Sequence, residues 1–247
     1  MYRHYAQEVQ RCQVLSCYHI CMGRAPRSAI GDTVYHVLNR ANGRMRIFQK
    51  RKDYEAFENV LAEAKKKQPM RILAYCLMPN HWHLVLYPYQ DGDLSNFMRW
   101  VTLTHTQRWH AHYKSIGYGH LYQGRYKSFP VQKDEHFLQL VRYVERNARR
   151  AALVKQAEDW RWSSLYKRQH GSEEEKKLLS SWPIKIDEDY IDWVNAPQPK
   201  EEIEIIRYAI KRGRPYGKDT WVSNIVTTLG LEVTMNQRGG YRRNQST

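Results

Sequence analysis

Long apolar runs are missing from this sequence of 247 residues. No stretch approaches the roughly 18 consecutive apolar residues that a membrane-spanning helix needs. The first residues also lack the unbroken apolar core of a secretory signal peptide, because Arg, His and Gln interrupt it. The sequence therefore predicts a cytoplasmic protein that has no membrane partner.

Cysteine is scarce, with four residues in the chain, and three of them lie within the first 21 positions. Cys17, His19 and Cys21 resemble half of a zinc site, although their spacing fits no common zinc-binding pattern. Met22 opens the basic segment MGRAPRSA, just before the first strand-like run. We therefore expect residues 1–27 to be an N-terminal extension, with the true start possible at Met22 and no structural role for what precedes it.

Acidic residues are too few to balance the basic ones, since 25 Asp and Glu face 40 Lys and Arg and leave a formal net charge of +15. A charge of this size favours a polyanionic partner, with nucleic acid ahead of an anionic membrane surface. Aromatic residues make up 13% of the chain. Aromatic faces beside cations can stack on unpaired bases, although most of these rings are expected in the core.

Apolar periodicity predicts an alternation of strands and helices in the first two thirds of the chain. Strands are expected over 33–39, 71–78, 81–86 and 126–132, and helices over 51–67, 93–113 and 134–154. Pro79-Asn80 joins the second and third strands as a hairpin, and Pro130 places the fourth strand at an edge. This order predicts an α+β fold, with a ferredoxin-like antiparallel sheet and helices packed on it.

The periodicity weakens after Ser164, which divides the chain into a patterned part and a tail. We expect one domain over residues 28–166. Residues 167–247 are expected to form a basic, mostly helical C-terminal extension, with two helical segments within 200–230 and a disordered end.

Two histidines on one predicted strand are the strongest candidates for metal binding. His81 and His83 stand at positions i and i+2, so both imidazoles point to the same face of the strand and can hold one cation. The alternative is a pair of structural histidines, because a chain with 11 histidines contains chance pairs.

Tyr143 and Asn147 lie on the polar side of the third predicted helix. Tyr143 falls well away from the apolar face, on a stripe that it shares with His136, Asn147 and Arg150. Tyr143 and Asn147 are four residues apart and are therefore neighbours. Such a pair can offer one nucleophile and one oxygen ligand.

A phenol needs activation before it can attack a phosphodiester. A Mg²⁺ or Mn²⁺ ion held by two imidazoles and an amide oxygen would polarise the scissile phosphate.

Several sequence blocks together give the chain a specific resemblance to a known family. NHWHLVL resembles the His-hydrophobic-His motif of the single-tyrosine HUH transposases. YHVLNRANGRMRIF, GRYKSFPVQ, LVRYVERNARRAALV and WRWSS resemble, in that order, the blocks of the REP-associated tyrosine transposases. RGRPYG and the basic ending resemble the C-terminal tail of that family. The resemblance runs from about residue 28 to about residue 215.

The resemblance implies a HUH nuclease fold and an enzyme, a transposase that nicks and joins single-stranded DNA at palindromic hairpins through a 5′-phosphotyrosine intermediate. It implies Tyr143 as the nucleophile, and His81, His83 and Asn147 as ligands of a divalent metal, Mg²⁺ or Mn²⁺. The chain departs from the family pattern in two places. Asn147-Ala148 replaces the usual Asn-Pro, and NRAN replaces NRGN in the first loop. The sequence leaves the choice between monomer and homodimer open.

Basic and aromatic residues near the first loop, before the fourth strand and on the third helix are candidate contacts to single-stranded or hairpin DNA. They are Arg40, Arg44, Arg46, Arg125, Tyr126, Lys127 and Arg150. The arginines can clamp phosphates, and Tyr126 between two cations can stack on a splayed base. Solvated charge and core packing are the alternatives. A non-catalytic protein that binds hairpin DNA or RNA on the same fold is therefore the second functional hypothesis.

Overall fold

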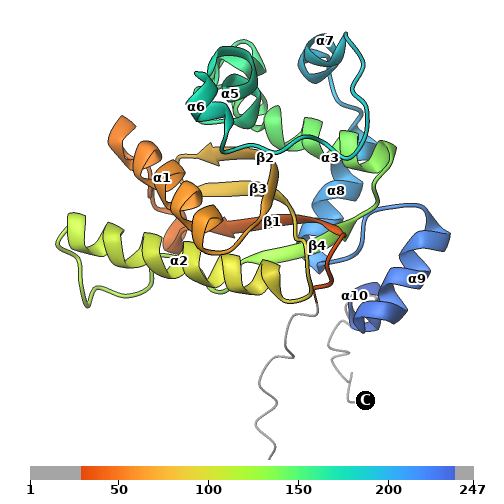
Figure 1. The fold of residues 1–247 in the computed structure, drawn as a ribbon, viewed down its shortest axis with the longest axis horizontal. Coiled ribbons are helices and arrows are strands. Elements are labelled where there is room, and N and C mark those ends of the chain that lie inside the picture. The colour runs from red at the N-terminus through yellow and green to blue at the C-terminus, as the bar shows by residue number, and fades with distance from the viewer. Residues whose placement is uncertain (1–28, 237–247) are drawn as a thin grey trace, which may run out of the picture.

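Four strands form the antiparallel sheet of the computed structural model, which describes residues 29–236 (Figure 1). They are β1 (Val34–Arg40), β2 (Arg71–Met78), β3 (His81–Tyr87) and β4 (Lys127–Val131). The strand order β2-β3-β1-β4 puts β4 at an edge, as Pro130 predicts. The predicted α+β class with an antiparallel sheet is confirmed. The zinc hypothesis at Cys17, His19 and Cys21, the start at Met22 and the expected disordered end concern residues outside the described range.

The strand register decides which side chains share a face of the sheet. Leu38 of β1 pairs with His83 of β3, and Arg40 pairs with His81. Because side chains alternate along a strand, these four residues and His36 point to the same face. The sheet therefore gathers three histidines and one arginine on a single side.

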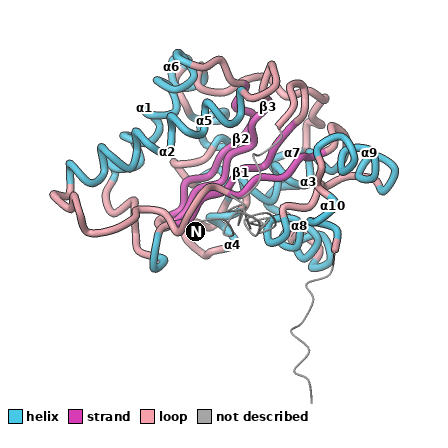
Figure 2. The backbone as a smooth tube through the Cα atoms, turned by 90° about the horizontal axis from the view of Figure 1, so that it is seen from below, coloured by secondary structure: helices cyan, strands magenta, loops and turns pink. Residues whose placement is uncertain are grey.

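Helices cover both faces of the sheet (Figures 1 and 2). On one side lie α1 (Arg51–Lys67) and α2 (Asp93–His112), and α3 (Glu135–Glu145) lies on the other. The remaining helical elements are η1 (Asn42–Arg44), α4 (Asn147–Arg150), η2 (Ala157–Asp159), α5 (Ser164–His170), α6 (Glu173–Lys176), α7 (Tyr190–Asn195), α8 (Lys200–Arg212), α9 (Asp219–Leu229) and α10 (Glu232–Met235). Within the described range, none of these helices combines the length and the apolar character that crossing a bilayer requires.

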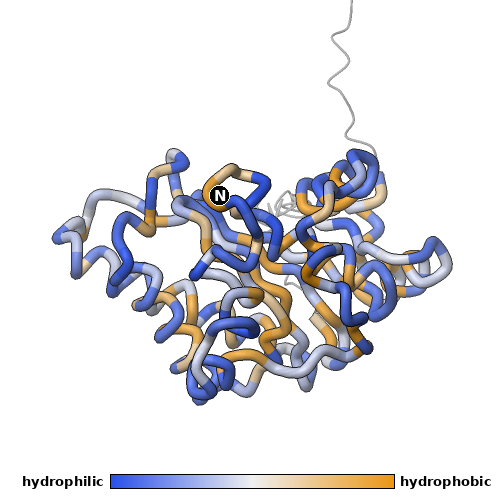
Figure 3. Tube along the Cα trace, turned by 90° about the horizontal axis from the view of Figure 1, so that it is seen from above, coloured by the Kyte–Doolittle hydropathy of each residue, from blue (hydrophilic) through white to orange (hydrophobic). Residues whose placement is uncertain are grey.

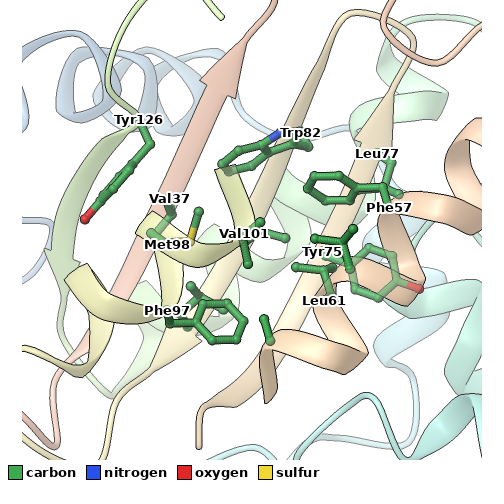
Figure 4. Close-up of a cluster of buried hydrophobic side chains, with 14 of the residues drawn as sticks. Val37, Phe57, Leu61, Tyr75, Leu77, Trp82, Phe97, Met98, Val101 and Tyr126 are labelled. Carbon is green, nitrogen blue, oxygen red and sulfur yellow. The ribbon is translucent and has the colours of Figure 1, made fainter. Parts of the chain in front are cut away.

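Each face of the sheet has its own apolar cluster. The first cluster, under α1 and α2, contains Phe57, Trp82 and Phe97 (Figure 4). The second cluster, under α3, contains Phe129 and Phe137. Figure 3 shows the hydrophobic segments running through the interior of the molecule. Because His81 and His83 alternate with residues of the first cluster, they lie on the side of the second cluster and of α3.

The third helix is shorter than its apolar spacing predicts. The prediction of one helix over 134–154 is wrong at its C-terminal end. At Arg146 ψ is 0°, which separates α3 from α4, and α4 ends at Arg150. Ala152 is in the left-handed region with φ of 55°, and Leu153 N–H donates to the Ala148 carbonyl at 3.0 Å. This Schellman arrangement ends the helix, and no glycine marks it in the sequence.

The segment that follows residue 166 packs on the second cluster. Ile206 of α8 is fully buried there. Tyr216 N–H donates to the Pro130 carbonyl at 2.9 Å, which adds a short parallel pairing to the edge strand β4. Arg142 of α3 donates to the Ala196 carbonyl at 2.9 Å. The two helical segments expected within 200–230 are confirmed as α8 and α9, and the tail helps to hold α3 in place.

His105 of α2 is a titratable group inside the first cluster. Its ring packs against Phe48 and Phe57, and its Nδ1 lies 2.6 Å from the hydroxyl of Tyr122. Burial lowers the pKa of His105 to about 3. The unfolded chain takes up a proton at this histidine below about pH 6.5, whereas the folded protein keeps the ring neutral. Folding stability therefore falls as the pH drops from about 6.5 toward 3.

Replacing His105 with Gln is expected to flatten the pH dependence of folding. Between pH 7 and pH 5 the His105 contribution to the loss of unfolding free energy is about 2 kcal/mol, and the variant lacks it. Urea unfolding at a series of pH values measures the difference. His112→Gln, at an exposed histidine of the same helix, is the control that keeps the wild-type slope. An unchanged slope in His105→Gln would contradict the prediction.

Candidate active site

β3 brings His81 and His83 to the face of the sheet that α3 covers. Their ring centroids are 5.1 Å apart, so the i, i+2 spacing places both rings on one side as predicted. Burial, with the charges of Arg40 and Arg150 nearby, lowers the pKa of His81 to about 4. Burial also holds the pKa of His83 well below its ordinary value. Both rings are therefore neutral near pH 7 and keep the lone pairs that a metal ion requires.

Tyr143 lies on α3, the helix that covers this face of the sheet, and its side chain contacts His83. Its ring meets that of His83 edge to face, with centroids 6.0 Å apart and an interplanar angle of 76°. The Tyr143 side chain is buried, with 5% of the residue exposed. The fold therefore brings the phenol beside the histidine strand, although the two segments are far apart in the sequence.

Arg150 connects Tyr143 with Asn147. Its guanidinium lies 4.1 Å from the centre of the Tyr143 ring, and its Nη1 donates to the Tyr143 carbonyl at 3.3 Å. Its Nη2 donates to Asn147 Oδ1 at 3.0 Å. Three residues of the stripe that the sequence predicts are thus in direct contact through the half-buried Arg150, whereas the fourth, His136, packs against Tyr216.

The donor atoms of this group fit a divalent metal ion. Two neutral imidazoles offer nitrogen ligands, and Asn147 offers an amide oxygen, which retains a second lone pair beside its bond from Arg150. Asn147 Nδ2 is buried and has no hydrogen-bond partner. A buried amide with one unsatisfied end indicates a polar component of the site beyond these side chains.

The comparison with known proteins gives the family of the part of the chain that holds these residues. Residues 29–147 match the family described as transposase, IS200 like. The matched segment is slightly less than half of the chain, and it contains His81, His83 and Tyr143. The match confirms the resemblance that the sequence blocks indicate.

Two known proteins are similar to more than half of this chain. The REP-associated tyrosine transposase of Escherichia coli (strain K12) is 24% identical over 138 residues, which are 56% of this chain and 78% of that protein. A solved structure of a REP-associated tyrosine transposase bound to a REP hairpin has a TM-score of 0.48 and 21% identity. The similarity covers 59% of this chain and 84% of the chain in that structure.

A second group of metal-type side chains lies at the start of α3, about two helical turns before Tyr143. The ligand atoms of Asp134, Glu135 and His136 lie within 4.8 Å of one another. Asp134 Oδ1 accepts from the backbone N–H of His136 at 3.0 Å, which caps the helix. Lys218 Nζ lies 3.3 Å from Glu135 Oε1. The helix cap and the ion pair with Lys218 explain why these three side chains lie close together.

The predicted DNA contacts within residues 29–147 gather at the end of the sheet that carries His81. Arg40 ends β1 opposite His81, and Lys127 begins β4 opposite Leu38. Asn80 Nδ2, in the turn before His81, donates to the Arg44 carbonyl at 3.3 Å. Of the candidates at this end, Arg44, Arg46, Arg125 and Lys127 are exposed and Arg40 is half-buried. The two loops and the hairpin therefore bring basic side chains to the edge of the histidine site.

Tyr126 lies between two of these cations, yet its side chain belongs to the first cluster. It is 8% exposed and lies near Val37 and Met98 (Figure 4). Tyr126 also lines a groove of about 960 Å³ together with Arg99 and Arg125. Its packing leaves little of the ring for a base, and its contact with DNA stays a prediction.

His36 is a residue of the site that the sequence does not reveal. It is 1% exposed, and its Nε2 lies 2.8 Å from Nδ1 of His83. The strand pattern over 33–39 is equally consistent with a histidine buried for packing. Only the register that pairs Leu38 with His83 shows that His36 and His83 meet.

Proposed function

We propose that this protein is a metal-dependent single-stranded DNA endonuclease and strand-transferase, a transposase that acts at palindromic hairpin sequences. The observation that carries the proposal is the approach of Tyr143 to His83 at 6.0 Å between ring centroids. A protein that only binds hairpins needs no phenol beside a pair of neutral imidazoles. The names of the two relatives, which refer to REP sequences, support hairpins of that kind as the substrate.

Tyr143 supplies the nucleophile in this proposal. Its phenolic oxygen attacks a phosphodiester and loses its proton, a 5′-phosphotyrosine bond forms, and the 3′-oxygen leaves and is protonated to a hydroxyl. A 3′-hydroxyl can later attack the phosphotyrosine and release the tyrosine, which joins two ends with no external energy source. The guanidinium of Arg150 fixes the ring of Tyr143 and provides positive charge beside it.

His81, His83 and Asn147 are the residues that would hold Mg²⁺ or Mn²⁺. Nδ1 of His81 lies 2.6 Å from Asn80 Oδ1, so Nε2 is the atom of His81 that is left for a metal. A bound divalent ion supplies charge neutralisation at the scissile phosphate. The chain itself supplies neutral imidazoles, because burial lowers the pKa of His81 to about 4.

Covalent trapping on DNA tests the proposed function. The protein is incubated with a library of single-stranded hairpins and Mn²⁺, and protein–DNA adducts are separated under denaturing conditions. Adducts with a subset of hairpins are expected, and EDTA or hairpin-free strands of the same length should give none. Tight hairpin binding with no adduct in Mg²⁺ or Mn²⁺ would favour the non-catalytic binding protein instead.

The basic residues at the sheet end are expected to provide affinity by binding phosphates. Replacing Arg44 or Arg125 with Ala should weaken hairpin binding and lower the slope of log affinity against log salt by about 0.7 to 1 for each arginine that binds a phosphate. Arg108→Ala is the matched control, since this exposed arginine of α2 is paired with Glu63 at 2.8 Å. Equal slopes for wild type, Arg44→Ala and Arg125→Ala would rule out phosphate binding by these arginines.

A further inference from the structure

His36 is a fully buried polar side chain that directly contacts a residue of the proposed metal site. Its Nε2 lies 2.8 Å from Nδ1 of His83, and the two ring centroids are 5.1 Å apart. Phe129 packs on the other side of the His36 ring at 4.9 Å between centroids. The hydrogen bond therefore links β1 to β3, the strand that carries the two proposed histidine ligands, on the face of the sheet that α3 covers.

This hydrogen bond leaves Nε2 as the ring nitrogen of His83 that can bind a metal. One proton is shared in this hydrogen bond, and the nitrogen that carries it decides whether Nε2 of His83 can bind a metal ion. If His83 donates from Nδ1, Nε2 keeps a lone pair for the ion. If His36 donates instead, the neutral His83 carries its proton on Nε2 and cannot be a ligand there.

Metal-binding histidines usually donate their second ring N–H to a carboxylate or a backbone carbonyl, which fixes the tautomer and the ring orientation. Here an imidazole takes the position of that acceptor. His36 is 1% exposed, and its Nε2 lies at hydrogen-bond distance from Nδ1 of His83, where such an acceptor has to be. An apolar side chain would fill the same space beside Phe129 without the cost of burying a polar ring.

We propose that His36 is a positioning residue for the metal site, which accepts a hydrogen bond from Nδ1–H of His83 and so keeps Nε2 of His83 available to the ion. This inference rests on the proposed function, because it requires His83 to be a metal ligand.

Two substitutions test the role of His36 as a hydrogen-bond acceptor separately from its role in filling space. His36→Phe retains a flat ring beside Phe129 and removes the acceptor. His36→Gln retains a side-chain oxygen that can accept from His83. Titration calorimetry with Mn²⁺ on the DNA-free protein should show roughly 10- to 100-fold weaker binding for His36→Phe. Affinity within a few-fold of wild type is expected for His36→Gln.

The outcomes distinguish this inference from the proposed function. If wild type binds no Mn²⁺, or His83→Ala binds it as wild type does, the metal site and the inference both fail. If His83→Ala loses Mn²⁺ while His36→Phe binds normally, only the role of His36 is overturned. Equal losses of affinity in His36→Phe and His36→Gln, with unchanged melting temperatures, would overturn the acceptor role.

A measurement on the wild-type protein makes the inference independent of how the variants fold. ¹⁵N–¹H correlation of the histidine rings reports which nitrogen carries the proton. We expect His83 in the metal-free protein to be protonated on Nδ1. A proton on Nε2 of His83 would overturn the proposal.

Discussion

Replacing Tyr143 with Phe is expected to abolish the covalent protein–DNA adduct while hairpin affinity stays nearly unchanged. The substitution removes only the phenolic oxygen that would attack the phosphate, so the rate of cleavage should fall by at least about 10⁴-fold. The ring that lies under Arg150 and beside His83 is retained, so the packing of α3 on the sheet should persist. Denaturing gels of labelled hairpins measure the adduct, and an equilibrium binding titration measures affinity.

The matched control for this experiment is Tyr126→Phe, in a tyrosine that is equally buried but lies in the first cluster on the other face of the sheet. It should form adducts as wild type does. If Tyr143→Phe still formed a covalent adduct, another residue would be the nucleophile, and Tyr126 would be the next to examine.

Loss of either histidine of β3 is expected to stop cleavage through loss of the metal ion. One remaining imidazole with a single amide oxygen offers too few ligands to hold a weakly bound divalent ion. In His81→Ala and His83→Ala, cleavage at ordinary Mg²⁺ concentrations should fall below detection. His81 is the cleaner site for this substitution, because it is only half-buried, whereas loss of the His83 ring also leaves His36 without its partner.

His136→Ala is the control that separates the two groups of metal-type side chains. His136 belongs to the group at the start of α3, where Asp134 caps the helix through the backbone N–H of residue 136, so the cap survives the substitution. Cleavage by His136→Ala should depend on Mg²⁺ as in wild type. Full activity of His81→Ala together with loss of activity in His136→Ala would place the metal at the start of α3.

The sequence by itself determined the elements and the local geometry of the candidate site. Period-two alternation and helical spacing located β1 to β4, α1 and α2 to within a few residues. The i, i+2 spacing of His81 and His83 fixed a shared face of β3, and the i, i+4 spacing of Tyr143 and Asn147 made them neighbours, although Tyr143 lies in α3 and Asn147 in α4. These relations depend only on backbone geometry over a few neighbouring residues, which the sequence pattern reports directly.

The tertiary structure alone decided what meets across elements. The register of β1 against β3 put His36 on His83, and the packing of α3 on that same face put Tyr143 there as well. Packing also placed the Tyr126 side chain in the core. The left-handed backbone conformation of Ala152 ended the helix that was predicted over 134–154 before its expected last residue. Register and choice of face depend on contacts between segments that are distant in the chain, and local periodicity contains no information about those contacts. The helix end depends on the local backbone conformation at Ala152, which apolar spacing does not report either.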